Sequence, residues 1–243
     1  MRSILFAGSF AAAVFAQWAL AQTAHADGLI YKLPAEGEQA RYEMEIAVSV
    51  GGQDVATKGS VTVSSVGQAT VDNEKCRWIE FKMIFKEDDQ ERITIAKTLI
   101  PEKHLGQGKS AGEHLIRGWV KEADMPPQEF KDLKAPGALS VAAFLAGPPK
   151  NAGELDKIEI DNAKLGKLSC AGVTGDQEID GPNGTQIIIN VENRLHEKTP
   201  FGLVVANWKF ELKSNGQVAV AGTFKLTLAE TNTTALSELP DRN

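Results

Sequence analysis

Two stretches of the chain alternate between apolar and polar residues with a period of two. Side chains of a β-strand point alternately to the two faces of a sheet, so this period predicts strands with one buried and one wet face. In the first stretch, short turns rich in Gly, Asp and Asn separate four such rows, which predicts an antiparallel meander. The rows are Tyr42–Val50, Val55–Val66, Cys76–Lys86 and Arg92–Ile100.

The second alternating stretch begins near Lys167 and predicts four more strands. Gly181-Pro182-Asn183-Gly184 and Asn215-Gly216 are strong turn signals between them. The last residues, 230–243, are polar, and we expect them to fray. The predicted strands are Leu168–Val173, Thr185–Glu192, Leu203–Lys213 and Val218–Ala229.

Between the two halves, in residues 101–166, the period of two fades. Glu113–Glu122 has helical spacing, and Pro126 predicts the first turn of another helix. Gly137–Leu145 predicts a short buried helix that Gly147-Pro148-Pro149 ends. We therefore expect one mostly β domain over 27–243, a curved antiparallel sheet or half-barrel packed against a short helical or loop insertion.

The first 26 residues have the layout of a secretory signal peptide. Arg2 precedes an apolar run, Ile4–Leu20, and Ala24-His25-Ala26 supplies the small residues of a cleavage site. The alternative is a membrane anchor, but a run of about 17 residues is at the lower limit for a span. We expect an exported protein, periplasmic or extracellular, that does not span the membrane after cleavage.

Composition narrows the class of partner. With 42% hydrophobic and 24% charged residues, the chain has enough apolar surface to form a core. Its net charge is −6, and loss of Arg2 with the leader makes it more negative. Nucleic-acid-binding proteins show a basic excess or stripe, so we expect no nucleic-acid partner. An anionic membrane surface is disfavoured for the same reason.

The two cysteines, Cys76 and Cys170, lie in opposite halves of the predicted sheet. In an oxidising compartment the first expectation is one disulfide between them. The chain-entropy model assigns roughly 4.7 kcal/mol to closing a loop of about 100 residues. The alternative is two separate buried thiols, and nothing resembles the Cys-x-x-Cys spacing of redox proteins.

Gly108-Lys109-Ser110-Ala111-Gly112 matches the G-x-S-x-G motif of serine hydrolases. Ser110 would be the nucleophile, and His114 or His196 the base. The motif belongs to parallel α/β sheets, whereas this chain predicts an antiparallel one, so the alternative is a flexible Gly-rich loop. A phosphate-binding P-loop is excluded, because Lys103 stands where that motif needs glycine.

Metal and cofactor sites have little support. The mature chain has three histidines, His104, His114 and His196, and none forms an H-x-x-x-H or H-E-x-x-H pair. Glu87-Asp88-Asp89 lacks the ligand spacing of an EF-hand loop. Carboxylate rows such as Glu43 and Glu45 are typical of the wet face of a sheet. We expect neither a metal nor a cofactor.

Aromatic residues of the predicted sheet and insertion suggest one large apolar face. It could be the core beneath the insertion, or the lining of a site for a lipid or another apolar molecule. The candidate ligand-binding residues are Trp78, Phe81, Phe85, Trp119 and Phe144.

The element Arg194–Val204, with Pro200-Phe201-Gly202 before a strand, resembles one found in small exported bacterial proteins. These include relatives of the LolA-like carriers of lipoproteins. The resemblance implies a half-barrel working in the cell envelope, and it transfers no functional residue. We expect a non-enzymatic protein that binds an apolar ligand or a cell-envelope partner on its concave sheet face. The alternatives are a serine hydrolase using Ser110 and a purely structural envelope protein.

Overall fold

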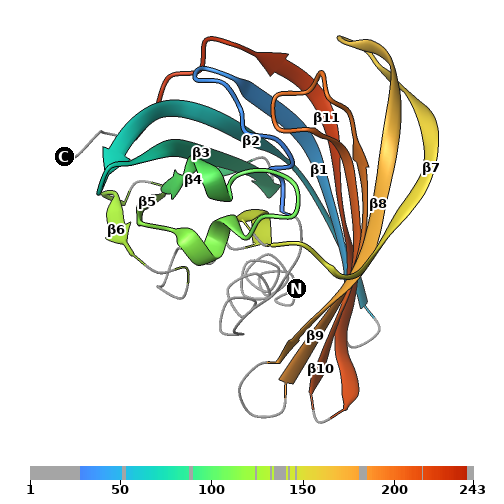
Figure 1. Ribbon diagram of the computed structural model, residues 1–243. Coiled ribbons are helices and arrows are strands. Elements are labelled where there is room, and N and C mark those ends of the chain that lie inside the picture. The colour runs from blue at the N-terminus through green and yellow to red at the C-terminus, as the bar shows by residue number, and fades with distance from the viewer. Residues whose placement is uncertain are drawn as a thin grey trace.

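The computed structural model describes residues 28–50, 53–87, 90–123, 125–131, 133, 141, 143–145, 147–180, 185–214 and 216–239. The fold is a single antiparallel sheet of 11 strands that curves without closing (Figure 1). The predicted class, a mostly β curved sheet, is confirmed. The predicted signal peptide, residues 1–26, lies outside the described residues.

Both predicted meanders are present, and the eight predicted rows all lie in strands. The first meander consists of β1 (Gln39–Val50), β2 (Gln53–Val71), β3 (Glu74–Glu87) and β4 (Gln90–Pro101). The second consists of β8 (Gly166–Asp180), β9 (Thr185–Leu195), β10 (Leu203–Ser214) and β11 (Gln217–Asn232). In both, each strand pairs with the next in the antiparallel sense.

The strand order shows how the halves join. It is β6-β5-β4-β3-β2-β1-β11-β10-β9-β8-β7. The chain starts at the centre with β1 and reaches one edge at β6 (Gln128–Phe130). It then crosses to the other edge at β7 (Lys150–Asn162) and returns to β11, which pairs with β1. The crossing from β6 to β7 thus joins opposite edges of the curved sheet.

The helical insertion predicted over 101–166 is largely wrong. Within Glu113–Glu122 lies the strand β5 (Arg117–Glu122), and the chain after Pro126 forms β6. Trp119 and Val120 are both buried, on opposite faces of β5. A strand buried on both faces has no alternating pattern, which explains the misprediction. The strand β7 was missed because it is a charged, mostly exposed edge strand.

Helix in the described part of the insertion is limited to short turns. These are the 3-10 turns η2 (Glu102–His104), η3 (Ala111–His114) and η4 (Ala143–Leu145), with one helical residue at Val141. Most of the predicted Gly137–Leu145 helix lies outside the described residues. No helix in the described part of the chain has the length and apolar character needed to cross a bilayer.

Buried side chains form two clusters on opposite faces of the sheet. The main core lies on the concave face and includes Tyr42, Phe81 and Phe224. A smaller cluster, which we call the outer cluster, lies on the other face of β3, β4 and β5. It consists of Cys76, Trp78, Ile95, Leu99, Trp119 and Leu239.

The predicted disulfide is absent, because both cysteines are free and buried. Cys76 belongs to the outer cluster, and Cys170 to the main core. The thiols therefore lie on opposite faces of the sheet. The alternative, two separate buried thiols, describes the structure.

The end of the chain is better ordered than the sequence suggests. Strand β11 continues to Asn232, and Leu239 is only 3% exposed, in the outer cluster. The polar segment after β11 thus reaches the outer face of the sheet, where Leu239 is buried. Residues 240–243 lie outside the described part of the chain.

Candidate functional site

The concave face of the sheet is filled by the chain itself. We call the filling segments the plug: residues 28–31, 102–115, 143–145 and 147–149, which lie inside the curve of the sheet (Figure 1). Phe144 of the plug stacks on Phe81 of β3, with ring centroids 5.8 Å apart, and lies 6.2 Å from Phe224 of β11. Phe144 and Leu145 are 3% and 1% exposed. The apolar face predicted from the sequence thus exists as a packed core.

The plug is held mainly by side-chain packing. It adds no strand over the concave face, and a few backbone hydrogen bonds fix it. Leu29 N donates to Phe144 O (2.9 Å), and Gln107 N donates to Tyr31 O (2.9 Å). Tyr31 N donates to Phe201 O at 2.8 Å, which ties the plug to the loop before β10. None of these hydrogen bonds belongs to a strand pairing.

A buried amide fixes the floor beneath the plug. Trp208 of β10 stacks on Phe224 at 5.0 Å and donates its Nε1 hydrogen to Asn193 Oδ1 at 3.0 Å. Asn193 is fully buried, and its Nδ2 donates to the Tyr31 hydroxyl. Buried polar groups need such partners, so Asn193 orients both aromatic rings. The sequence signal was available, since Asn193 continues the buried row of Ile189 and Val191 on β9.

The sheet divides the predicted ligand-binding residues into two groups. Phe81 and Phe144 lie in the main core, with Phe85 packed at its margin. Trp78 and Trp119 lie in the outer cluster, with ring centroids 5.2 Å apart. The structure therefore brings three of the five together on the concave face.

Ser110 does not occupy a nucleophile elbow. It lies between a loop and the 3-10 turn η3, with φ −98° and ψ 72°, and every described strand pairing is antiparallel. Gly147 packs against it so closely that a Cβ would come within 2.5 Å of Ser110 Oγ. His114 stacks on His104 at 3.3 Å, and His196 Nδ1 accepts a hydrogen bond from Lys198 N at 3.1 Å. An elbow needs a parallel strand followed by a helix, so this context does not support a serine hydrolase.

The described residues include no group of three or more metal-ligating side chains. They do include a hollow of about 610 Å³ on the polar face of β1, β2 and β8–β11. Polar and charged side chains line much of it, among them Glu45, Lys58, Asn190, Asn207 and Lys225. Ile46, Val191, Trp208 and Phe224, which belong to the main core, also line this hollow.

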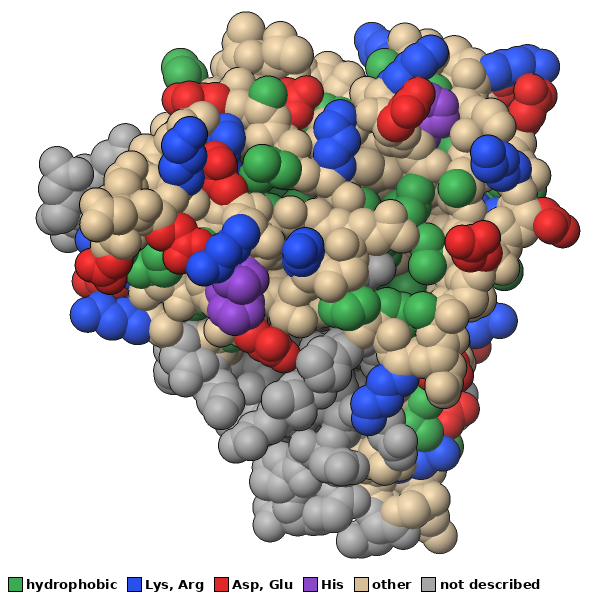
Figure 2. Space-filling view, in the orientation of Figure 1, with side chains coloured by type: hydrophobic (Ala, Val, Ile, Leu, Met, Phe, Trp, Pro, Cys, Tyr) green, Lys and Arg blue, Asp and Glu red, His purple; other side chains and the backbone are tan. Residues whose placement is uncertain are grey.

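The face drawn in Figure 2 has no separate acidic and basic patches among its described residues. Acidic and basic side chains are interspersed there, and hydrophobic side chains gather between the plug and β8. A nucleic-acid-binding surface would show continuous basic character, which the described residues on this face lack.

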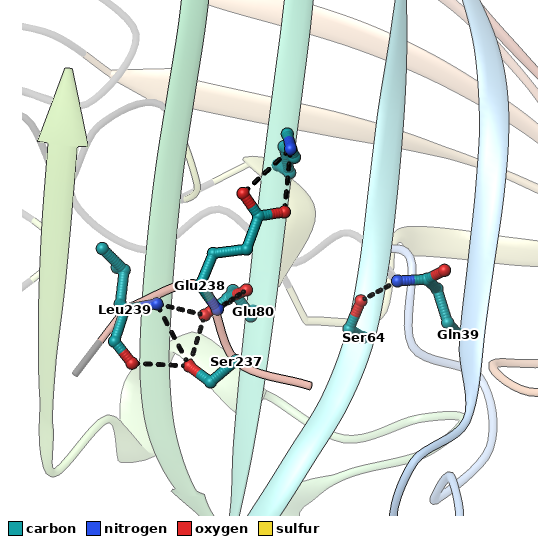
Figure 3. A network of polar contacts seen from close by, with 7 residues as sticks. Gln39, Ser64, Glu80, Ser237, Glu238 and Leu239 are labelled. Carbon is teal, nitrogen blue, oxygen red and sulfur yellow. Dashed lines mark hydrogen bonds and ion pairs between the residues drawn. The ribbon is translucent and has the colours of Figure 1, made fainter. Parts of the chain in front are cut away.

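A second polar site, which the sequence did not predict, lies on the outer face (Figure 3). The carboxylate of Glu80 on β3 accepts hydrogen bonds from Ser237 Oγ (2.7 Å), Glu238 N (3.0 Å) and Leu239 N (3.3 Å). Lys82 Nζ lies 2.8 and 2.9 Å from the two carboxylate oxygens of Glu238. The final described residues are thus held by side chains of β3.

Lys97 on β4 completes the outer-face site. It donates to Leu239 O at 3.5 Å, and its Nζ lies 5.0 Å from the centre of the Trp78 ring. Lys97 faces Glu80 on one neighbouring strand and Trp119 on the other. Lys97 is 0% exposed and Glu80 4%. The sequence signal was a lysine in the row of Ile93, Ile95 and Leu99. Ile95 and Leu99 belong to the outer cluster, and Ile93 packs against it.

No protein-family model matches the chain, and no curated protein matches it. Solved structures with a similar fold exist. A Bacteroides fragilis protein with a YmcC-like fold, proposed to be exported, is 9% identical (TM-score 0.33); the alignment covers 83% of this chain and 98% of that one. A proposed lipoprotein from Parabacteroides distasonis is 8% identical (TM-score 0.34; 85% and 99% covered).

A Vibrio parahaemolyticus domain proposed to belong to an outer membrane lipoprotein-sorting protein is also similar. It is 10% identical, with a TM-score of 0.27, and the alignment covers 84% of this chain and 89% of that one.

Proposed function

We propose that this is an exported, non-enzymatic protein that binds an apolar molecule, such as a lipid acyl chain, on its concave sheet face. The observation that supports this is the position of Phe144. It fills the centre of the concave face, against Phe81 and Phe224, from a segment that adds no strand there. The ligand takes the place of the plug side chains.

The magnitudes favour such an exchange. Exposing a buried Phe side chain costs about 1.5–3 kcal/mol, whereas burying an acyl chain gains about 0.8 kcal/mol per methylene. A chain of about ten carbons therefore offsets the exposure of Phe144 and one or two further plug residues. Sheet pairing stays intact, because the plug contacts the sheet mainly through side chains.

The exported location rests on the leader pattern of Arg2, Ile4–Leu20 and Ala24-His25-Ala26. In that compartment a small exported protein with a filled apolar face could carry or shield a lipid. The alternative of a structural envelope protein makes the opposite prediction, because its core stays filled by its own side chains.

Native mass spectrometry of the mature protein purified from its own envelope tests the proposal. We expect a released apolar molecule at about one per chain after solvent extraction. Protein at its bare mass, with no bound molecule in any preparation, favours the structural alternative.

Two variants locate the site. Phe144→Ala removes the main competitor for the concave face, so we expect it to bind an acyl probe about tenfold more tightly. Trp119→Phe changes the outer cluster and should leave the affinity as it is. Equal affinities for wild type and Phe144→Ala would place the ligand elsewhere.

A further inference from the structure

The outer-face site formed by Glu80, Lys82 and Lys97 has the features of a peptide-binding site. The two consecutive N–H groups of Glu238 and Leu239 both donate to the one carboxylate of Glu80. Lys97 donates to the carbonyl of Leu239. These contacts hold the main chain of a bent segment, whose two consecutive N–H groups point toward the same carboxylate. They work for any sequence except proline at the two donor positions.

Two further contacts recognise side chains of the bound segment. Lys82 forms an ion pair with Glu238. Leu239, 3% exposed, packs in the outer cluster with Trp78 and Trp119. One subsite thus takes an acidic side chain and the next an aliphatic one, and Ser237 Oγ adds a third contact by donating to Glu80 at 2.7 Å.

The site is built in advance by the sheet. Glu80 and Lys97 are register partners on β3 and β4, and Trp119 on β5 is the register partner of Lys97. Three adjacent strands therefore fix the charged and aromatic groups, whatever segment occupies the site. The occupying segment, in contrast, follows four residues that are exposed or half-buried, and Leu236 is 85% exposed.

We propose that the outer-face site is a recognition site for a short, bent Ser-acidic-Leu segment of a partner protein, with Ser237–Leu239 as its resident occupant. A partner segment of the same chemistry displaces the resident one. This inference is independent of the function proposed for the concave face, because the two sites lie on opposite faces of the sheet.

The test uses the full mature chain with a weakened resident segment. Leu239→Asp places a charge in the outer cluster and releases the segment. Glu238→Lys, which opposes Lys82 at a half-exposed position, is the milder second variant. The probe is a fluorescein-labelled synthetic peptide with the sequence of residues 234–242. We expect saturable 1:1 binding to either variant that is at least tenfold tighter than to the wild-type chain, whose own segment competes.

Charge exchange makes the test specific. In the chain with the released segment, Lys82→Glu should lower the affinity for the wild-type peptide about tenfold. It should restore binding of a peptide carrying Glu238→Lys. Glu80→Gln should weaken both peptides, because it removes the acceptor for the main chain.

Near-UV circular dichroism shows which variants are folded. If a folded variant shows no saturable binding, the proposal is overturned. It is also overturned if the affinity does not change with the charge of residue 82. If the wild-type chain forms dimers that the peptide dissociates, the segments are exchanged between two copies of this chain. That result would overturn the assignment to a partner protein.

Discussion

Phe144 stacks on Phe81 with their ring centroids 5.8 Å apart, although 62 positions separate them in the sequence. One ring belongs to the crossing between opposite sheet edges and the other to the centre of the concave face. Through this contact, the chain fills the centre of its own concave face. Whether a ligand can replace that contact decides the function of the protein.

Removing the Phe144 ring should destabilise the empty protein. Phe144→Ala deletes a side chain that is 3% exposed, and such truncations cost about 3–5 kcal/mol. Urea denaturation measures the loss. Leu236→Ala, at a side chain that is 85% exposed, is the control and should change the free energy of unfolding by less than about 0.5 kcal/mol. A Phe144→Ala loss no larger than that of the control would show that the ring does not pack as described.

Both cysteines should be detected as free thiols by a thiol reagent once the protein is unfolded. Burial raises the pKa of the Cys76 thiol and of the Cys170 thiol, so both should resist a thiol reagent in the native protein. Denaturant without reductant should release two reactive thiols per chain. If protein purified without reductant shows no reactive thiol after unfolding, the two cysteines form a disulfide. That result would contradict their placement on opposite faces of the sheet.

The sequence predicted the strands that have one buried face and one exposed face. It did not predict the strands whose two faces are both buried or both exposed. Rows such as Ile79, Phe81 and Met83 alternate with charged residues, so β3 was evident. Strand β5 is buried on both faces, and β7 is exposed along most of its length, so neither carries the period of two. Nor did the sequence show which leucine of the polar tail is buried: Leu239 is 3% exposed, whereas Leu236 is 85% exposed.

The candidate sites depended on information that alternation does not contain. Alternation within Cys76–Lys86 already places Trp78 and Phe81 on opposite faces, but it could not show that Trp119 shares the face of Trp78. That follows from the pairing of β3, β4 and β5, which depends on contacts far apart in the chain. The disulfide failed for the same reason, because the two cysteines were assigned to halves of the sheet and not to faces.

Arg77 and Glu102 should contribute to stability as a pair. Arg77 Nη2 lies 2.6 Å from Glu102 Oε1, and the Arg77 side chain is 6% exposed. Arg77→Met leaves Glu102 without this partner, and breaking a buried pair costs about 3 kcal/mol. The double variant Arg77→Met, Glu102→Met should recover part of that loss in urea denaturation. A double variant as unstable as the sum of the two single ones would contradict the coupling.

Mild acid should weaken the plug at the pair of stacked imidazoles. Burial, followed by the charge on His114, lowers the pKa of His104 below its ordinary value. The unfolded chain therefore binds a proton at this position more readily than the folded one. The stabilisation is complete above about pH 6.5, the ordinary histidine pKa, and is lost as the pH falls through the folded pKa.

His104→Gln should flatten this dependence. Urea midpoints measured at about pH 7.5 and pH 5 should differ less in the variant than in the wild-type chain. His196→Gln is the control, because its ring accepts a hydrogen bond in the loop before β10 and does not contact the imidazole pair. An unchanged pH dependence in His104→Gln would show that other groups control it.

Fluorescence quenching by a brominated fatty acid tests the central claim most directly. Trp208 lies in the main core on the concave face, against Phe224, whereas Trp78 and Trp119 lie in the outer cluster. If the acyl chain binds on the concave face, its bromine atoms quench mainly Trp208 in the mature chain. We predict saturable quenching that Trp119→Phe retains and Trp208→Phe largely removes. Absence of quenching, or quenching that persists in Trp208→Phe, would contradict binding on the concave face.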